Sequence, residues 1–65
     1  MKIGWIILNK EVGLFVESPA KFTHERKKAL VFDTRNAARE AKLGKSEVVR
    51  KVELFENGKA KRILP

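Results

Sequence analysis

Residues 3–9 read IGWIILN, the longest apolar run of this 65-residue sequence. The run mixes β-branched residues with Trp5 and is too short for a typical globular helix, so it predicts a β-strand. Successive side chains of a strand point to opposite faces, which places Ile3, Trp5 and Ile7 on one face and Ile6 and Leu8 on the other. Because both faces are apolar, this strand is expected to lie in the middle of a sheet.

Two further strands are expected before the middle of the chain. Turn residues over 9–13 lead into a strand at Leu14–Glu17, which would form an antiparallel hairpin with the first strand. The dipeptide Ser18-Pro19 ends it, because proline lacks the amide donor that a central strand needs. After a connection of mixed character over 18–28, the apolar run Ala29–Asp33 predicts a short third strand.

One helix is expected, over Arg35–Leu43. Asp33 and Thr34 are good N-cap residues, and Gly44 would close the helix as a C-cap glycine. Three alanines at helical spacing would form the inward face and let the helix backbone pack closely against large sheet residues. These are Ala37, Ala38 and Ala41.

The last two expected strands, Glu47–Phe55 and Lys59–Leu64, flank the dipeptide Asn57-Gly58. Two-residue hairpin loops favour type I′ turns, which need positive φ at both positions, and Asn-Gly tolerates this best. The register of such a hairpin sets residues of opposite charge across from each other. The expected pairs are Glu56 with Lys59 and Glu53 with Arg62.

These elements predict a single α+β domain over residues 1–65. It would be a small antiparallel sheet of four to five strands with one short helix on one face, in the order β-β-β-α-β-β. A helix of about nine residues is about 14 Å long and covers one face of a small sheet but not two. The other face would be an apolar interface, unless the loop carrying Phe22 folds over it. The expected interface residues are Ile6, Leu8, Phe15, Val31, Val49 and Phe55.

The charge of the chain is strongly positive: fifteen Lys and Arg against eight Asp and Glu give a formal charge of +7. Such an excess favours an anionic partner, since each neutralised phosphate releases condensed counterions. The alternative is that the cations only fill solvent positions and keep the protein soluble. Three of them, at spacings of four and three, would form one stripe along the helix. The expected nucleic-acid-binding residues are Arg26, Lys27, Lys28, Arg35, Arg39 and Lys42.

No residue pattern in the sequence indicates catalysis. His24 is the single histidine and there is no cysteine, so neither a catalytic set nor a metal site has its partners at ligand spacing. The four glycines are isolated from one another and form no phosphate-cradling loop. We therefore expect a non-enzymatic protein without cofactor or metal. The first apolar run is too short to span a membrane and lacks the features of a signal peptide, so a cytoplasmic location is expected.

Four short segments, which together span about half of the chain, form a pattern. It consists of Gly13-Leu14-Phe15-Val16, Lys21-Phe22-Thr23, Ala29-Leu30-Val31-Phe32-Asp33-Thr34 and Ala37-Ala38. This arrangement resembles small uncharacterised phage and bacterial proteins, and the resemblance implies a shared scaffold and a phage or prophage origin with no activity attached.

Two functional hypotheses follow from the sequence. The first is a small basic binding protein that contacts nucleic acid or another anionic surface through its Lys and Arg clusters. Contacts would be to the backbone with little sequence preference, because no base-reading element is present. The alternative is a protein-interaction module that binds a host protein, or forms a homodimer, through the uncovered apolar sheet face.

Overall fold

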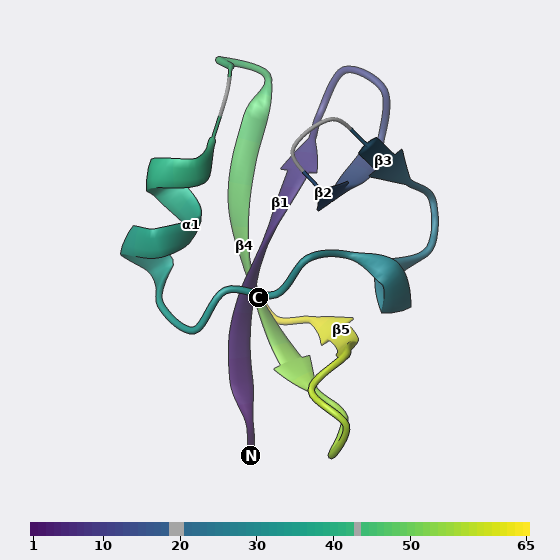
Figure 1. The fold of residues 1–65 in the computed structure, drawn as a ribbon, viewed down its shortest axis with the longest axis vertical. Coiled ribbons are helices and arrows are strands. Elements are labelled where there is room, and N and C mark those ends of the chain that lie inside the picture. Colours follow the sequence, from purple (N-terminus) through teal and green to yellow (C-terminus); the bar gives the residue numbers. More distant parts are fainter. Residues whose placement is uncertain (19–20, 43) are drawn as a thin grey trace.

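The computed structural model describes residues 1–18, 21–42 and 44–65, and these form a five-stranded antiparallel sheet with one α-helix and one 3₁₀ turn (Figure 1). The sheet order is β3-β2-β1-β4-β5. The expected α+β class is confirmed, and the apolar run at residues 3–9 is the central strand, as expected. The elements are β1 (Ile3–Asn9), β2 (Leu14–Ser18), β3 (Lys21–Thr23), η1 (Arg26–Lys28), α1 (Arg35–Ala41), β4 (Glu47–Leu54) and β5 (Ala60–Ile63).

The expected third strand at Ala29–Asp33 is wrong. The third strand is β3, at Lys21–Thr23, where it pairs with β2. The described elements follow one another along the chain as β-β-β-α-β-β, apart from η1, but this predicted order does not match the order of the strands across the sheet, β3-β2-β1-β4-β5. Within 29–33 only Phe32 takes part in a β-bridge.

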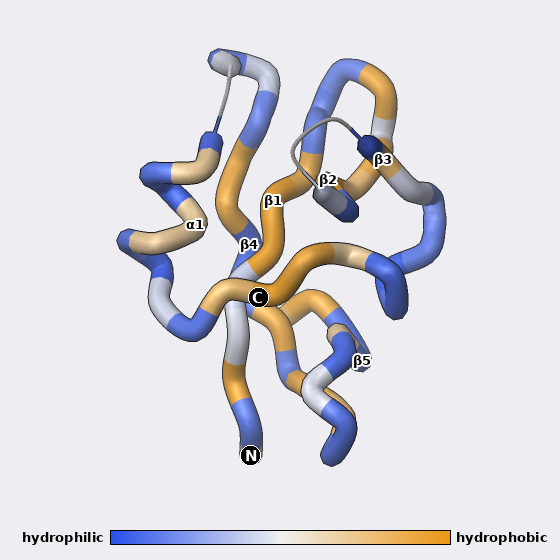
Figure 2. Tube along the Cα trace, in the orientation of Figure 1, coloured by the Kyte–Doolittle hydropathy of each residue, from blue (hydrophilic) through white to orange (hydrophobic). Residues whose placement is uncertain are grey.

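Segment 29–32 connects the two faces of the sheet. Strand β2 pairs with β1 only at Leu8 and Asn9, so the backbone of β1 nearer its start needs another partner on that side. Phe32 supplies it: its N–H donates to the Trp5 carbonyl at 2.8 Å, and the Trp5 N–H donates to the Phe32 carbonyl at 3.0 Å. In Figure 2 this segment is the orange, apolar part of the tube that crosses β1.

The face of the sheet that carries Ile6 is closed by the chain itself. Ile6 is 0% exposed and belongs to a core with Ala29, Val52 and Ala60. Ala29 directly follows η1, and η1 packs against β5. The expectation that a single short helix leaves one apolar face uncovered is therefore wrong. This face is covered by η1, Ala29 and β5, whereas α1 covers the other face.

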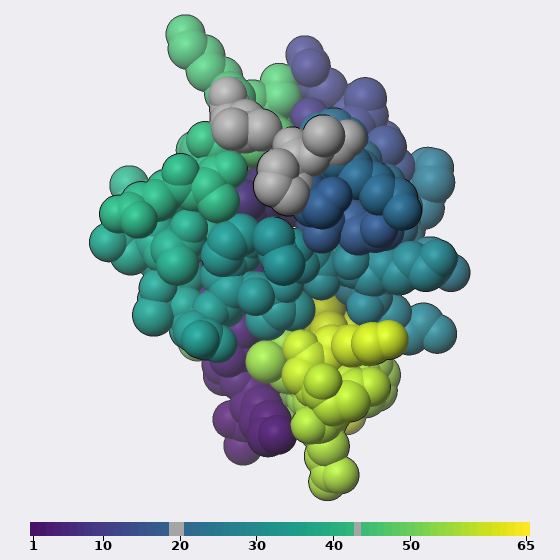
Figure 3. All heavy atoms as spheres, in the orientation of Figure 1, coloured from purple at the N-terminus to yellow at the C-terminus, as the bar shows by residue number. Residues whose placement is uncertain are grey.

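Helix α1 lies against β1 and β4 and begins as predicted. Thr34 is the N-cap, and its side-chain oxygen accepts a hydrogen bond from the Ala37 N–H at 3.1 Å. Of the three alanines expected to face inward, only Ala38 is buried, and the helix has only about two turns. In Figure 3 the side chains of α1 and of the segment before it extend over the middle of the molecule.

The end of α1 differs from the prediction. The C-cap is Lys42 with a φ of −69°, and Gly44 is not among the described glycines with positive φ, so the expected glycine cap is wrong. Leu43, which was expected to end the helix, lies outside the described residues. No helix in residues 1–18, 21–42 and 44–65 is long and apolar enough to cross a membrane.

The β4–β5 hairpin has a three-residue loop in place of the expected two-residue turn. Gly58 takes a φ of +86°, whereas Asn57 does not have positive φ, which excludes a type I′ turn. Asn57 instead accepts a hydrogen bond on Oδ1 from the Lys59 N–H at 3.0 Å. The Phe55 N–H donates to the Lys59 carbonyl at 2.8 Å, so Lys59 lies opposite Phe55 and the expected Glu56–Lys59 pair is wrong.

The second expected pair of this hairpin is confirmed. The register shifts by one residue between Glu53 and Leu54, which compensates for the extra loop residue. Glu53 is thereby paired with Arg62, whose Nε donates to Glu53 Oε1 at 2.7 Å.

A close approach at Gly4 gives a first prediction. A Cβ atom at this position would lie 2.6 Å from Val31 Cγ1 and 3.1 Å from both terminal carbons of Leu54. Gly4→Ala is therefore expected to overpack the core and lower the free energy of unfolding by about 1–3 kcal/mol, measured by urea unfolding. The matched control is Gly44→Ala, where nothing lies within 4 Å of the new atom. Equal unfolding midpoints for the two variants would contradict the packing described.

Candidate nucleic-acid interface

The six predicted nucleic-acid-binding residues lie in two groups. Arg26, Lys27 and Lys28 form η1, which packs against β5, whereas the other three are on or just after α1, which packs against β1 and β4. The two elements lie on opposite sides of β1 in Figure 1. The six residues therefore do not form one surface.

The three cations of the helix group line a shallow groove against β4. Arg35, Arg39 and Lys42 line it from the helix side, and Val48 and Val49 line it from β4. The spacing of four and three residues along the helix predicted this stripe, and the structure confirms that the three side chains face one hollow. The helical spacing did not indicate that β4 forms the other side of this groove.

A second hollow adjoins the first and shares Arg35 and Val49 with it. Its other residues include Arg50 and Lys51 of β4 and the partly exposed side chain of Trp5. We call the two hollows together the α1–β4 groove. It gathers five cations over a floor of three apolar residues. The cations are Arg35, Arg39, Lys42, Arg50 and Lys51, and the floor is Trp5, Val48 and Val49.

Sequence reasoning missed four residues of this groove, namely Trp5, Val48, Arg50 and Lys51. Trp5 and Lys51 are directly opposite each other in the β1–β4 ladder, so they share a face of the sheet. The alternation along β4 does contain this signal, since Val49 and Lys51 are two apart. However, the alternation only becomes informative once β4 is known to lie beside β1.

Four of the cations outside the groove are paired with acids. Four ion pairs occur in the described parts of the chain, and none of them includes a cation of the α1–β4 groove. They are Lys21–Glu17 at 3.0 Å, Lys28–Glu25 at 3.0 Å, Lys61–Glu53 at 3.7 Å and Arg62–Glu53 at 2.7 Å. The positive charge of the groove is thus available to an external anion, whereas part of the charge near η1 and on β5 is already neutralised.

Arg35 has an aromatic partner inside the groove. Its guanidinium carbon lies 5.9 Å from the centre of the Trp5 ring, which is within the range of a cation–π contact. This contact holds the Arg35 side chain over the floor of the groove and keeps its charge at the point where the two hollows meet.

The ion pair between Glu25 and Lys28 shifts the pKa of both partners. Lys28 lowers the pKa of the Glu25 carboxyl, first through their hydrogen bond and then through its charge, and Glu25 in turn raises the pKa of the Lys28 ammonium. Since the pKa of Glu25 is lowered in the folded protein, its stabilising effect is present above its ordinary pKa and is lost as the pH falls through the folded value. The pair is exposed to solvent, so this effect on stability is small.

Lys28→Met is accordingly expected to return the pKa of Glu25 to its ordinary value, as followed by NMR titration of the side-chain carboxyl. Lys27→Met is the matched control, because the charge of Lys27 is the smallest of the causes acting on Glu25. If both variants shifted the pKa of Glu25 equally, the specific Glu25–Lys28 pair would be refuted.

The six predicted interface residues do not share one exposed face. Ile6 is fully buried, and Phe15 and Val31 pack against the same core. Leu8 is half-buried, and Val49 lies opposite Ile7 and lines the α1–β4 groove. Phe55 is exposed at the end of β4, with the Lys61 ammonium 5.9 Å from its ring centre. A single apolar patch built from these six residues is therefore absent.

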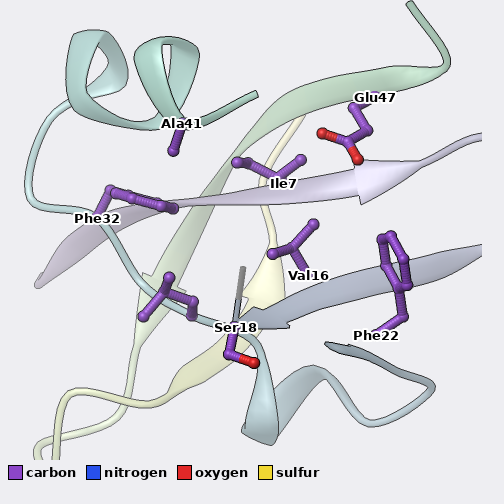
Figure 4. Close-up of a pocket in the computed structure, with 8 residues that line it drawn as sticks. Ile7, Val16, Ser18, Phe22, Phe32, Ala41 and Glu47 are labelled. Carbon is purple, nitrogen blue, oxygen red and sulfur yellow. The ribbon is translucent and has the colours of Figure 1, made fainter. Parts of the chain in front are cut away.

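An apolar cavity of about 220 Å³ lies between α1 and the first two strands (Figure 4). Ile7, Val16 and Phe32 point into it, and the side chain of Glu47 stands at one end. Phe22 and Leu30, both more than one third exposed, also line it, as do Ser18 and Ala41. Among the described residues, the polar side chains that line the cavity are those of Ser18 and Glu47.

Neither metal ligation nor relationship to other proteins provides a further lead. The described residues contain no group of three or more His, Cys, Asp or Glu side chains arranged to hold a metal ion. Comparison of the chain with protein-family models, with curated proteins and with solved structures gives no match. The resemblance to small phage and bacterial proteins stays a prediction, and the functional argument depends on the α1–β4 groove.

Proposed function

We propose that this protein is a small, non-enzymatic basic binding protein that holds nucleic acid in the α1–β4 groove. One observation carries the proposal: five cations from two elements meet in adjoining hollows, and none of them forms an ion pair within the described residues. A row of uncompensated cations attracts a polyphosphate backbone, and release of the condensed counterions favours the complex.

The expected mode of binding is contact with phosphates. Helix α1 has seven residues and is about 10 Å long, and it packs against the sheet rather than projecting from it as a recognition helix does. The groove is shallow, so the backbone lies along its surface. We therefore expect little sequence preference.

The test is the salt dependence of binding. A fluorescently labelled oligonucleotide is titrated with the protein at several salt concentrations, and anisotropy gives the association constant. The logarithm of this constant is expected to fall linearly with the logarithm of salt concentration. If all five groove cations engage phosphates of a single strand, the slope is about −3.5. Absence of binding at low ionic strength, or an affinity that does not change with salt, would reject the proposal.

The alternative is a protein partner, either a host protein or a second copy of the chain. What supports it is the exposure of Phe22 and Leu30 at the rim of the apolar cavity, since neighbouring exposed apolar side chains are typical of contact surfaces. Sedimentation of the purified protein tests the homodimer: a monomer at high concentration excludes it. The phage or prophage origin and the cytoplasmic location expected from the sequence are compatible with both functions.

A further inference from the structure

We propose that the α1–β4 groove selects single-stranded nucleic acid, with one unpaired base stacked on the indole of Trp5. This inference rests on the proposed function and names the form of nucleic acid that the groove takes. The observation behind it is the position of a partly exposed tryptophan on the floor of a cationic groove.

Trp5 lies in the central strand of the sheet. Its backbone pairs with Lys51 of β4 on one side and with Phe32 on the other. Because both edges of the strand are engaged at this residue, the indole has a fixed location relative to the groove walls. A fixed aromatic surface is what base stacking requires.

Cations line the hollow that contains the ring. Lys51 lies directly opposite Trp5 in the β1–β4 ladder, Arg50 precedes it in β4, and the Arg35 guanidinium lies over the ring at 5.9 Å from its centre. An incoming base takes the place of the guanidinium over the ring, which leaves Arg35 to contact the adjacent phosphate. This combination of a stacking surface with a backbone-tracking charge is that of single-strand binding sites.

A duplex does not use this arrangement. In a double helix the faces of the bases are stacked on one another, so a protein ring at the bottom of a shallow groove meets only sugar and phosphate. An acidic peptide would engage the cations but has no base to place on the indole. Trp5 therefore favours single strands over both of these polyanions.

The experiment uses the fluorescence of Trp5, which is the one tryptophan of the chain. The wild-type protein is titrated with oligothymidylate, with the duplex of oligothymidylate and oligoadenylate, and with inorganic polyphosphate. Stacking is expected to quench the indole strongly with the single strand and weakly with the other two. Oligothymidylate is also expected to bind more tightly than the duplex at the same salt concentration.

Variants of Trp5 separate stacking from charge. Trp5→Leu is expected to lower the affinity for oligothymidylate about five- to a hundredfold and to lower the affinity for polyphosphate much less, because polyphosphate loses only the contact that positions Arg35. Trp5→Phe keeps an aromatic ring and is expected to retain most of the affinity. Circular dichroism checks that both variants fold, and if Trp5→Leu does not, the wild-type quenching and the Trp5→Phe affinity decide the question.

The outcomes distinguish this inference from the proposed function. Equal affinities for single strand and duplex, with no selective quenching, would overturn the stacking of a base and leave polyanion binding standing. Equal binding of poly-glutamate and oligothymidylate would likewise overturn the selection of single strands. Absence of binding to any of these polyanions at low salt would overturn both.

Discussion

Ile6→Ala is expected to lower the free energy of unfolding by about 2–5 kcal/mol. Ile6 is 0% exposed and sits in the core with Ala29, Val52 and Ala60. Two of these neighbours are alanines, and their side chains are too short to fill the cavity that the substitution creates. A domain of this length has a total stability of about 3–10 kcal/mol, so this one substitution removes about a fifth or more of it. Urea or thermal unfolding followed by circular dichroism measures the loss.

Two further isoleucine substitutions serve as controls. Ile6→Val removes one methyl group from the same site and is expected to cost about 0.5–1.5 kcal/mol. Ile63→Ala makes the same chemical change as Ile6→Ala, but at a residue of β5 that is 37% exposed, and its loss is expected to be clearly smaller. If Ile63→Ala were as destabilising as Ile6→Ala, the face that η1 and β5 cover would not be the main core.

Local patterns predicted the parts of the fold that depend on neighbouring residues. The apolar run over 3–9 gave β1, and the capping residue Thr34 gave the start of α1. The pairing of Glu53 with Arg62 was also predicted. The loop, however, has one residue more than expected, and a register shift between Glu53 and Leu54 compensates for it. Opposite charges across the hairpin thus indicated the register better than the turn type did.

Non-local contacts decided what the sequence could not predict. The apolar run over 29–33 has the composition of a strand, yet its backbone bonds reach two different strands, from Leu30 to Val16 and between Phe32 and Trp5. No local pattern contains that information. The covering of the Ile6 face by η1 and β5 was missed for the same reason, and with it the fate of the expected interface.

The sequence predicted the helix side of the candidate site but not its sheet side. Helical spacing alone places Arg35, Arg39 and Lys42 on one stripe, and the structure keeps them together. Trp5 and Lys51 join them only because β1 and β4 pair in a particular register, which spacing within one element cannot specify. Conversely, Arg26-Lys27-Lys28 has a higher charge density in sequence, but it lies on another side of the sheet and Lys28 is paired with Glu25.

The double charge reversal Arg35→Glu with Arg39→Glu is expected to lower the affinity for single-stranded DNA about 30- to 1,000-fold at low salt. Each reversal removes an attraction of about 1 kcal/mol at contact distance in water and adds a repulsion of up to the same size, and two of them together amount to about 2–4 kcal/mol. Because two phosphate contacts are lost, the salt slope is expected to become shallower by about 1.4. Anisotropy titration at several salt concentrations measures both quantities.

The matched control is Lys27→Glu with Lys28→Glu in η1. Each reversal changes the charge by two, so both double variants lower the formal charge from +7 by the same amount, and long-range attraction weakens equally in both. Only the first variant removes cations from the α1–β4 groove, so the control is expected to keep the salt slope of the wild type and to lose much less affinity. Equal losses in the two variants would mean that the protein attracts nucleic acid through its net charge, without using the groove between α1 and β4.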